Sequence, residues 1–235
     1  MTPHSPPIEP PVIAGQTAVL ETLRVGDQDY QIYRVPDLDR LLDEIDAVEF
    51  EKDERMPYWA ELWPSGVALA TFLAEETTLR GVRMLELGCG LGLPSIVAAR
   101  MGARVTATDY CPEALDLLRV NAALNEVRLE TRLLDWRTPC RVVRFGLVVA
   151  ADVLYEPWQV ECVVEVLCRT VMPGGRAVVV DPDRVAAKPF ASAATFRGFR
   201  VQNRRLEGRK PGMSVVIHDL THDATPGGVS SQPVG

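Results

Sequence analysis

Residues 83–109 read RMLELGCGLGLPSIVAARMGARVTATD, and this stretch decides the fold class. An apolar run ends in a glycine-rich turn, a helical segment follows at 93–102, and a second apolar run ends at Asp109. A strand, a helix and a strand in this order form the βαβ unit of a parallel sheet. Glycines in the first turn let the backbone bend sharply and let a ligand approach closely.

The same alternation continues toward the C-terminus, with strands rich in Val, Leu and Ala between amphipathic helices. The expected elements after residue 103 are strands at 104–110, 129–136, 145–152 and 175–181 and helices at 111–126, 158–172 and 187–198. Strands of this composition are typical of a parallel sheet that is covered on both faces. Two final strands, 200–208 and 213–220, are joined by a connection of hairpin length, so one of them should run antiparallel. We therefore predict a Rossmann-like α/β fold with a mostly parallel seven-stranded sheet and an antiparallel C-terminal hairpin.

A hairpin and helices are expected ahead of this sheet. Residues 18–35 form two strands around Gly26-Asp27, Asp37 can cap a helix over 38–48, and Pro64 suits the start of a helix through 67–77. We predict a disordered proline-rich tail at 1–15 and a second disordered tail at 221–235. Between them, the hairpin and helices at 16–82 pack on the core, and the Rossmann-like domain spans 83–220.

Composition and charge narrow the possible functions. The 235 residues are 47% apolar and carry a formal charge of -7, which argues against a nucleic-acid partner because phosphate contacts need a broad basic surface. One local basic cluster, with a solvated edge strand as the alternative interpretation, comprises Arg197, Arg200, Arg204, Arg205, Arg209 and Lys210.

Cysteine and histidine usage bears on metals and on location. Five cysteines without a Cys-x-x-Cys pair, and three histidines near the termini, predict neither a disulfide framework nor a metal site. The first residues do not resemble a signal peptide, and no apolar run is long enough to span a bilayer. We therefore expect a cytoplasmic protein without a membrane partner, and the sequence leaves the oligomeric state open.

The glycine-rich turn predicts the cofactor. The spacing of Gly88, Gly90 and Gly92 is not the Gly-x-Gly-x-x-Gly pattern of dinucleotide-binding proteins, and no Gly-Lys-Ser/Thr sequence of a P-loop is present. Glu86 precedes the turn, where a carboxylate would repel a pyrophosphate but would attract the cationic amino acid half of S-adenosylmethionine. The alternative interpretation is a tight turn that binds no ligand.

Two more acids follow at strand ends. Asp109 can accept both hydroxyls of a ribose, or it can cap the next helix, or both. Asp135 can accept from the adenine amino group with Trp136 near the ring, and a turn residue is the alternative. Their order along the chain is more specific than any single acid, because ligands of open α/β sheets bind at the carboxyl ends of the strands.

The sequence resembles the family 16 methyltransferases, which include many protein-lysine methyltransferases. Three stretches carry the resemblance: PYWAELWPSGVALATFL from residue 57, LELGCGLGLPSIVAARMGARVTATDY from residue 85, and ADVLYE from residue 151. The first is most similar to the branch of the electron-transfer-flavoprotein β-subunit lysine methyltransferase. The resemblance covers about residues 55–182 and implies the class I methyltransferase fold, with S-adenosylmethionine as cofactor and S-adenosylhomocysteine as product.

The resemblance also implies a set of site residues. Asp152 and Tyr155, the Asp-x-x-Tyr motif after the fourth strand of the core, would hold the methyl acceptor. Trp59 and Glu61 would lie near the entrance. No metal is expected, and the residues predicted to bind the cofactor are Trp63, Glu86, Gly88, Cys89, Gly90, Gly92, Asp109, Tyr110, Asp135, Trp136 and Ala151.

These residues suit transfer of a methyl group to a lysine. An ammonium has no free lone pair, so the transfer needs a neutral and correctly aimed amine. A carboxylate such as Asp152 can capture the cation and orient it, and the ring of Tyr155 can form a wall. We predict a protein-lysine N-methyltransferase, whose partner is a protein with a target lysine. The alternatives are a small-molecule N- or O-methyltransferase, an enzyme that acts on another protein side chain, and a cofactor-binding regulatory protein without activity.

Overall fold

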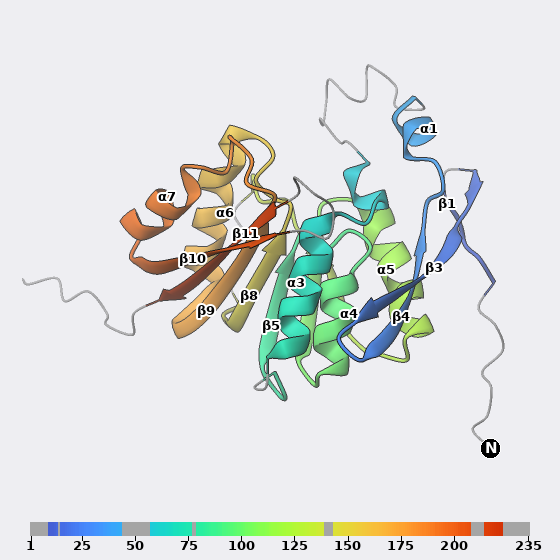
Figure 1. Ribbon diagram of the computed structural model, residues 1–235, viewed down its shortest axis with the longest axis horizontal. Helices are drawn as coiled ribbons and strands as arrows, with labels where there is room; N and C mark the ends of the chain where they lie inside the picture. Colours follow the sequence, from blue (N-terminus) through green and yellow to red (C-terminus); the bar gives the residue numbers. More distant parts are fainter. Residues whose placement is uncertain are drawn as a thin grey trace, which may run out of the picture.

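The computed structural model describes residues 9–13, 15–43, 57–76, 79–138, 143–207 and 214–222. A seven-stranded sheet forms its centre (Figure 1). Its strands are β5 (Arg83–Leu87), β6 (Arg104–Asp109), β7 (Glu130–Leu133), β8 (Phe145–Ala151), β9 (Val171–Asp181), β10 (Phe199–Glu207) and β11 (Ser214–His222).

The strand order across the sheet is β10-β11-β9-β8-β5-β6-β7. The five strands from β7 to β9 pair in parallel, while β11 pairs antiparallel with both β9 and β10. The predicted fold class is therefore confirmed, including the antiparallel C-terminal hairpin. Because β5, β6 and β8 are parallel neighbours, the turns that follow them meet at one edge of the sheet.

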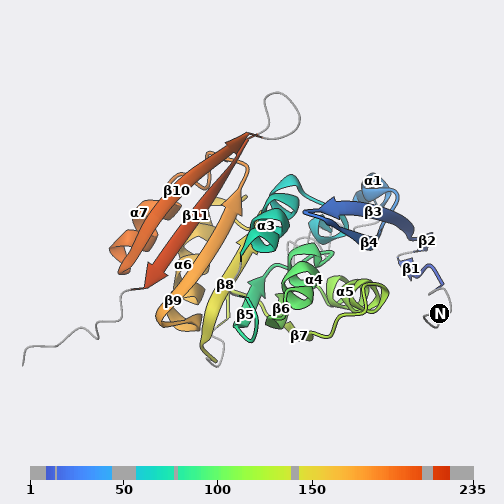
Figure 2. The same cartoon turned by 60° about the horizontal axis from the view of Figure 1, so that its bottom comes forward.

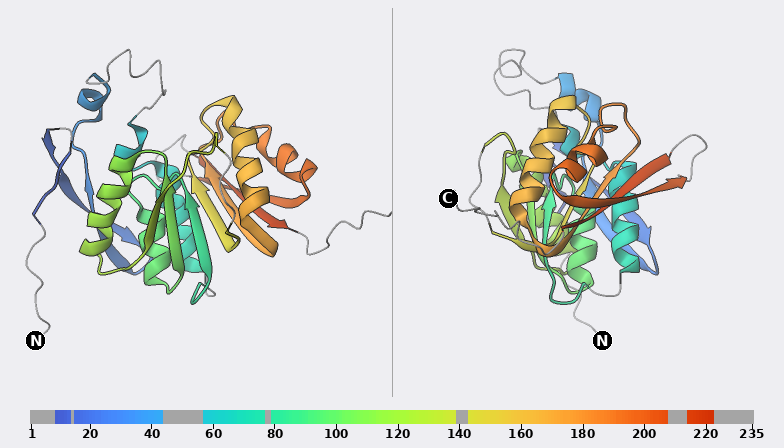
Figure 3. Two further views of the ribbon diagram at one scale, coloured as in Figure 1. Left: turned by 180° about the vertical axis from the view of Figure 1, so that it is seen from behind. Right: turned by 90° about the vertical axis from the view of Figure 1, so that its left-hand side faces the viewer.

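Helices cover the sheet on two faces. One face carries α3 (Pro64–Glu75), α4 (Leu93–Arg100) and α5 (Pro112–Leu124), and the other carries α6 (Pro157–Thr170) and α7 (Phe190–Phe196) (Figures 2 and 3). Successive side chains of a strand point to opposite faces, so β8 serves both layers. Leu147 and Val149 pack on the α3–α5 side, and Val148 and Ala150 pack on the α6–α7 side.

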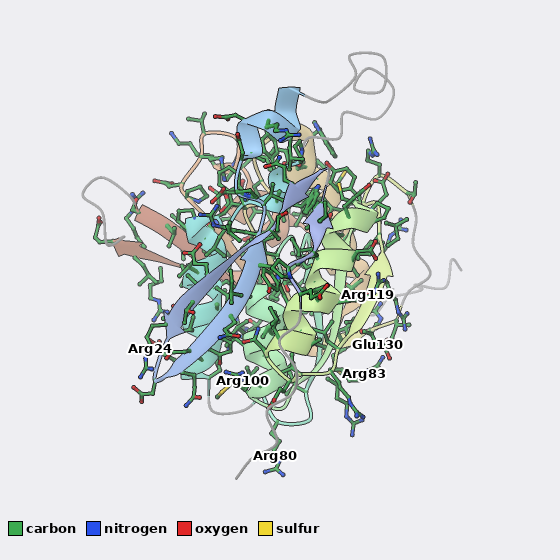
Figure 4. The ribbon with its side chains drawn as sticks, turned by 90° about the vertical axis from the view of Figure 1, so that its right-hand side faces the viewer. Arg24, Arg80, Arg83, Arg100, Arg119 and Glu130 are labelled. Atoms are coloured by element: carbon green, nitrogen blue, oxygen red, sulfur yellow. The ribbon has the colours of Figure 1, made fainter. Side chains whose placement is uncertain are left out.

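The N-terminal hairpin consists of β3 (Val19–Val25) and β4 (Gln28–Arg34), which pair antiparallel as predicted. It packs on α5, where Asn121 Oδ1 accepts from Tyr33 N at 2.7 Å and Asn125 Oδ1 accepts from Gln31 N at 3.0 Å. From α4, Arg100 lies 4.5 Å from the centroid of the Tyr30 ring, below the hairpin in Figure 4. The hairpin is thus held to the α/β core by buried and partly buried hydrogen bonds as well as by apolar packing.

The first helix, α1 (Leu38–Asp43), starts as predicted, since Asp37 Oδ1 accepts from Arg40 N at 3.0 Å. The remainder of the helix expected at 38–48 lies outside the described residues. Two short strands, β1 (Val12–Ile13) and β2 (Gln16–Thr17), pair antiparallel, so the prediction of disorder up to residue 15 is wrong at Val12 and Ile13. That prediction relied on the proline-rich composition of the segment, whereas Val12 and Ile13 pair through their backbone with Thr17 and Gln16.

At the other end, β11 runs to His222, two residues past the predicted end of the domain. Residues 1–8 of the tail predicted at 1–15 and residues 223–235 of the tail predicted at 221–235 lie outside the described residues, so the domain boundaries there stay predictions. No helix within the described ranges has the length and apolar character needed to cross a membrane.

Gly92 at the start of α4 offers a test of this packing. Its φ is 82°, and a Cβ at this position would lie 2.0 Å from Cδ1 of the fully buried Leu118. Gly198 has a similar φ of 92° but no atom within 4 Å of such a Cβ. We expect Gly92→Ala to lower the free energy of unfolding by about 1–3 kcal/mol more than Gly198→Ala does, as measured by urea denaturation. Equal losses in the two variants would show that the contact with Leu118 is not constraining.

Candidate functional site

The glycine-rich turn after β5 lies against two neighbouring segments. Gly90 has a φ of 48°, and a Cβ there would lie 3.2 Å from the carbonyl oxygen of Trp59, in the 3-10 helix η1 (Tyr58–Ala60). The backbone N–H of Cys89 donates to Thr108 O at 2.9 Å, which joins the turn to β6. A side chain on Gly90 would press against the backbone of Trp59, and one on Gly88 would lie 3.0 Å from Val153, so the turn brings bare backbone to the carboxyl edge of the sheet.

A cavity of about 100 Å³ lies at this edge. It is formed by the ends of β5, β6 and β8 together with η1 and the segment that leads into α3. Its lining includes all of the predicted site residues except Gly92 and Asp135, and two further residues, Tyr58 and Val153. The lining is Tyr58, Trp59, Glu61, Trp63, Glu86, Gly88, Cys89, Gly90, Asp109, Tyr110, Trp136, Ala151, Asp152, Val153 and Tyr155.

Glu86 is the most buried acid of this lining, with 1% of its surface exposed. Its Oε2 accepts a hydrogen bond from Ser95 Oγ of α4. Burial disfavours the charged form and raises the pKa of Glu86 to about 8, against the opposing effect of the Ser95 hydrogen bond. Glu86 therefore carries a proton at neutral pH unless a cation lies beside it.

Asp109 is 4% exposed and uses both carboxylate oxygens on backbone donors. Oδ2 accepts from Gly90 N at 3.0 Å and Oδ1 accepts from Cys111 N at 3.0 Å. Burial raises the pKa of Asp109, and the two backbone hydrogen bonds oppose that shift. Cys111 is the N-cap residue of α5, so Asp109 binds the N–H that precedes the helix and is not its side-chain cap.

Three aromatic rings form a cluster on one side of the cavity. Tyr58 makes edge contacts with Trp63 and with Tyr155, at centroid distances of 6.0 and 5.5 Å. The indole Nε1 of Trp63 donates to Tyr58 O at 2.7 Å, which fixes the plane of that ring. Burial raises the pKa of Tyr155, so its phenol stays neutral.

A second cavity of about 270 Å³ adjoins the first and shares this cluster. Its lining is Tyr58, Trp63, Asp152, Tyr155, Glu156 and Arg184. Aromatic walls around a carboxylate form a surface that suits an organic cation.

Asp152 lies where the two cavities meet. Its backbone is left-handed, with a φ of 57°, a conformation that aspartate tolerates better than most residues. Oδ1 is paired with Arg184 Nη1, whereas Oδ2 is buried and has no hydrogen-bond partner. Asp152 is not the cap of α6, because Glu156 and Gln159 form the capping box of that helix.

The unpartnered atoms of the lining test the fit of a cofactor and an acceptor. Trp136 Nε1 is a second buried polar atom without a partner, so the lining presents one free donor and one free acceptor beside the acids Glu86 and Asp109. Buried polar groups are normally satisfied, and each exception needs an explanation. A ligand with a cationic amino acid part and a polar ring system fits this combination of one hydrogen-bond donor and several acidic acceptors.

Two predicted site residues are not brought to either cavity. Asp135 directs its carboxylate to Arg137, whose Nη2 lies 2.7 Å from Oδ2, and Gly92 faces Leu118. Their contacts with a cofactor stay predictions. Conversely, Tyr58 and Arg184 belong to the site but were not among the residues predicted from the sequence. Tyr58 belongs to the PYWAELWP stretch that was singled out, whereas nothing in the spacing relates Arg184 to Asp152.

Another groove, of about 480 Å³, lies at the amino-terminal edge of the sheet. Arg83 and Glu130, which Figure 4 labels, line it together with Arg104, Arg128 and Arg132. It contains none of the predicted site residues. Among the described residues, no group of three or more His, Cys, Asp or Glu side chains could hold a metal ion, and the expectation of no metal stays a prediction.

Comparison with known proteins gives similar sequences over this region. The electron transfer flavoprotein beta subunit lysine methyltransferase of Xenopus laevis is 35% identical over 135 residues, which is 54% of this chain and 53% of that protein. The human protein of the same name is 34% identical over 102 residues, 43% of this chain and 39% of that protein. The chain thus spans about half, or less, of the length of these curated relatives.

Solved structures show the fold. The N-methyltransferase NodS from Bradyrhizobium japonicum WM9, in complex with S-adenosylhomocysteine, superimposes with a TM-score of 0.58 at 18% identity. The superposition covers 79% of this chain and 96% of NodS.

The sequence profile of the lysine methyltransferase family matches residues 43–189, which is more than half of the chain. The resemblance found in the sequence is therefore confirmed: the chain belongs to the lysine methyltransferase family, has the Rossmann-like class I methyltransferase fold, and by that membership uses S-adenosylmethionine.

Proposed function

We propose that this protein transfers a methyl group from S-adenosylmethionine to the side-chain amine of a lysine in a protein substrate. The observation that carries the proposal is Oδ2 of Asp152, a buried and unpartnered carboxylate oxygen at the junction of the two cavities. The similar proteins named lysine methyltransferases, from vertebrates, support the same substrate class.

The residues of the first cavity fit the cofactor. Glu86 would take the ammonium of its amino acid part, and the bare backbone of Gly88 and Gly90 would allow close approach. Asp109 has one lone pair left on each oxygen for ribose hydroxyls, and Trp136 offers an unpartnered N–H. When bound, the cofactor supplies an electrophilic methyl group on a sulfonium.

The residues of the second cavity act on the acceptor. The Asp152 carboxylate attracts the lysine ammonium, and the rings of Tyr58, Trp63 and Tyr155 surround its alkyl chain and its charge. The reaction needs the neutral amine, so the ammonium gives its proton to water while the carboxylate keeps the nitrogen aligned. The protein thus positions the two substrates, and the new bond forms directly between the lysine nitrogen and the methyl group of the cofactor.

A labelling experiment tests the proposal. The protein is incubated with methyl-labelled cofactor and a lysate of cells that lack it, and the label is followed into protein and into small molecules. We expect labelled protein whose hydrolysate contains methylated lysine. Label in small molecules alone would support the small-molecule alternative, and label on another side chain would change the acceptor. We thus propose that the methyl acceptor is a protein. We also propose that the enzyme is located in the cytoplasm.

Asp152→Asn tests the role of the carboxylate. Asparagine keeps the shape and tolerates the left-handed backbone but lacks the charge, so we expect kcat/KM for the protein acceptor to fall by about 10²–10³. The Kd for S-adenosylhomocysteine should change little, and Tyr155→Phe should lose less activity because the ring remains.

The matched control for this variant is Asp183→Asn. Asp183 also has a left-handed backbone, with a φ of 62°, and it pairs with Arg205 outside both cavities. Normal turnover is expected for this control. Near-wild-type turnover of Asp152→Asn would eliminate the proposed role of Asp152.

Glu86 predicts a coupling between cofactor binding and pH. The pKa of Glu86 is about 8 in the free protein, and an ammonium beside it would lower that pKa. Binding of S-adenosylhomocysteine at pH ~7 should therefore release protons, seen in calorimetry as a dependence of the measured enthalpy on buffer ionisation. Glu86→Gln should bind without this release, whereas Glu113→Gln, on the exposed first turn of α5, should keep it. Proton uptake by the wild-type protein would contradict the assignment.

A further inference from the structure

The ends of two neighbouring strands bring the guanidinium of Arg184 to the carboxylate of Asp152. Asp152 follows β8, and the adjacent strand β9 ends at the first residue of the segment 181–184, which reads DPDR. Asp183 adopts a left-handed backbone with a φ of 62°, and the next residue, Arg184, reaches back to β8. The contact joins residues that are 32 positions apart in the chain.

Arg184 is held at both ends by Asp181. The backbone N–H of Arg184 donates to Asp181 Oδ1 at 2.7 Å, and its Nη1 lies 3.3 Å from Asp181 Oδ2. The same Nη1 pairs with Oδ1 of Asp152. The side chain of Asp181 is fully buried and that of Asp152 is 8% exposed, so this pairing is only weakly screened by water.

We propose that Arg184 is a positioning residue that holds one oxygen of Asp152 so that the other oxygen faces the acceptor amine. The inference rests on the proposed function, in which Asp152 orients the lysine. It assigns a task to a residue outside the Asp-x-x-Tyr motif and explains why only Oδ2 of Asp152 is left without a partner.

Charge balance supports this role. Asp152 and Asp181 carry two negative charges when ionised, and Arg184 carries one positive charge. The group therefore has one negative charge left, which a single lysine ammonium neutralises. Glu156 also lines this cavity, but its side chain accepts from the backbone at the third position of α6. Without Arg184, two buried carboxylates would lie near each other with no counter-charge, which is strongly unfavourable.

The geometry of arginine suits the task better than that of lysine. A guanidinium offers several N–H donors in one plane and can serve two carboxylates while it remains charged. With 30% of its side chain exposed, Arg184 still lines the cavity and does not block it. In a competing role, Arg184 would occupy the place of the substrate cation. Replacing Arg184 would then raise the activity, whereas the positioning role predicts that it falls.

Steady-state kinetics of Arg184 variants test the proposal, with the unmethylated form of the acceptor that the labelling experiment identifies as the substrate. We expect Arg184→Gln to lower kcat/KM for the acceptor by about 10–100-fold, mostly through kcat, because the lysine still meets a carboxylate but is poorly aligned. Arg184→Lys should recover part of the loss. The Kd for S-adenosylhomocysteine should stay within about twofold of wild type, because only positioning of the acceptor is removed. Arg205→Ala, which breaks the exposed pair with Asp183 on the same loop, is the matched control and should behave as wild type.

A second measurement needs no substrate. In a double-mutant cycle of Asp152→Asn and Arg184→Gln, the urea midpoints of unfolding should be clearly non-additive, since each single variant leaves its partner unpaired. The corresponding cycle of Asp183→Asn and Arg205→Ala should be near additive because that pair is exposed.

The outcomes separate this inference from the proposed function. Additive midpoints for Asp152 and Arg184, unchanged kcat/KM in Arg184→Gln, or a gain of activity in that variant would each overturn the positioning role. An equal loss of affinity for S-adenosylhomocysteine would overturn it as well, since Arg184 would then support the whole site. If the wild-type protein methylates another acceptor and no lysine, the proposed function fails, and the same variants compared on that acceptor still decide the role of Arg184.

Discussion

The carboxylate of Asp109 is the interaction on which the site depends. It accepts one backbone N–H from the glycine-rich turn and one from the start of the α5 segment, both at 3.0 Å. Burial of a charge is costly unless hydrogen bonds replace its hydration, and here two backbone donors offset part of that cost. Because these donors belong to different loops, Asp109 fixes the turn after β5 relative to the turn after β6. The floor of the first cavity follows from that constraint.

Asn121 extends this constraint to the N-terminal hairpin. Its side chain is fully buried, accepts from Tyr33 N at 2.7 Å, and donates both to Tyr33 O and to Leu91 O at 3.1 Å. One amide therefore joins the hairpin, α5 and the glycine-rich turn. A buried amide whose donors and acceptor are all used specifies a unique arrangement, because any shift leaves a polar atom unsatisfied. The hairpin supports the turn from behind and does not contribute to the lining of the cavity.

Asp109 and Asp152 illustrate how similar strand-end acids acquire different tasks. Asp109 ends β6 and Asp152 directly follows β8, so both lie at the same edge of the sheet, and both side chains are largely buried. Each oxygen of Asp109 already has a backbone partner, so this acid organises the protein first and any ligand second. Asp152 instead has one oxygen on a guanidinium and one oxygen without a partner, an arrangement that leaves attraction for a further cation. The difference lies in their partners and not in the residue type.

The sequence by itself determined the order of strands and helices, the glycine-rich turn, and the positions of Glu86, Asp109 and Asp152 at strand ends. These features depend on periodicity and on turn chemistry, which are local properties of the chain. It also indicated the aromatic stretch before α3, through a resemblance to a family.

Only the tertiary structure decided which of these groups meet. It set Tyr58 against Tyr155 and brought Arg184 to Asp152. Such contacts depend on which strands are neighbours and on left-handed turns at single residues, and neither leaves a periodic signal in the sequence. The residue types were therefore readable in advance, whereas the pairing that leaves one oxygen of Asp152 free was not.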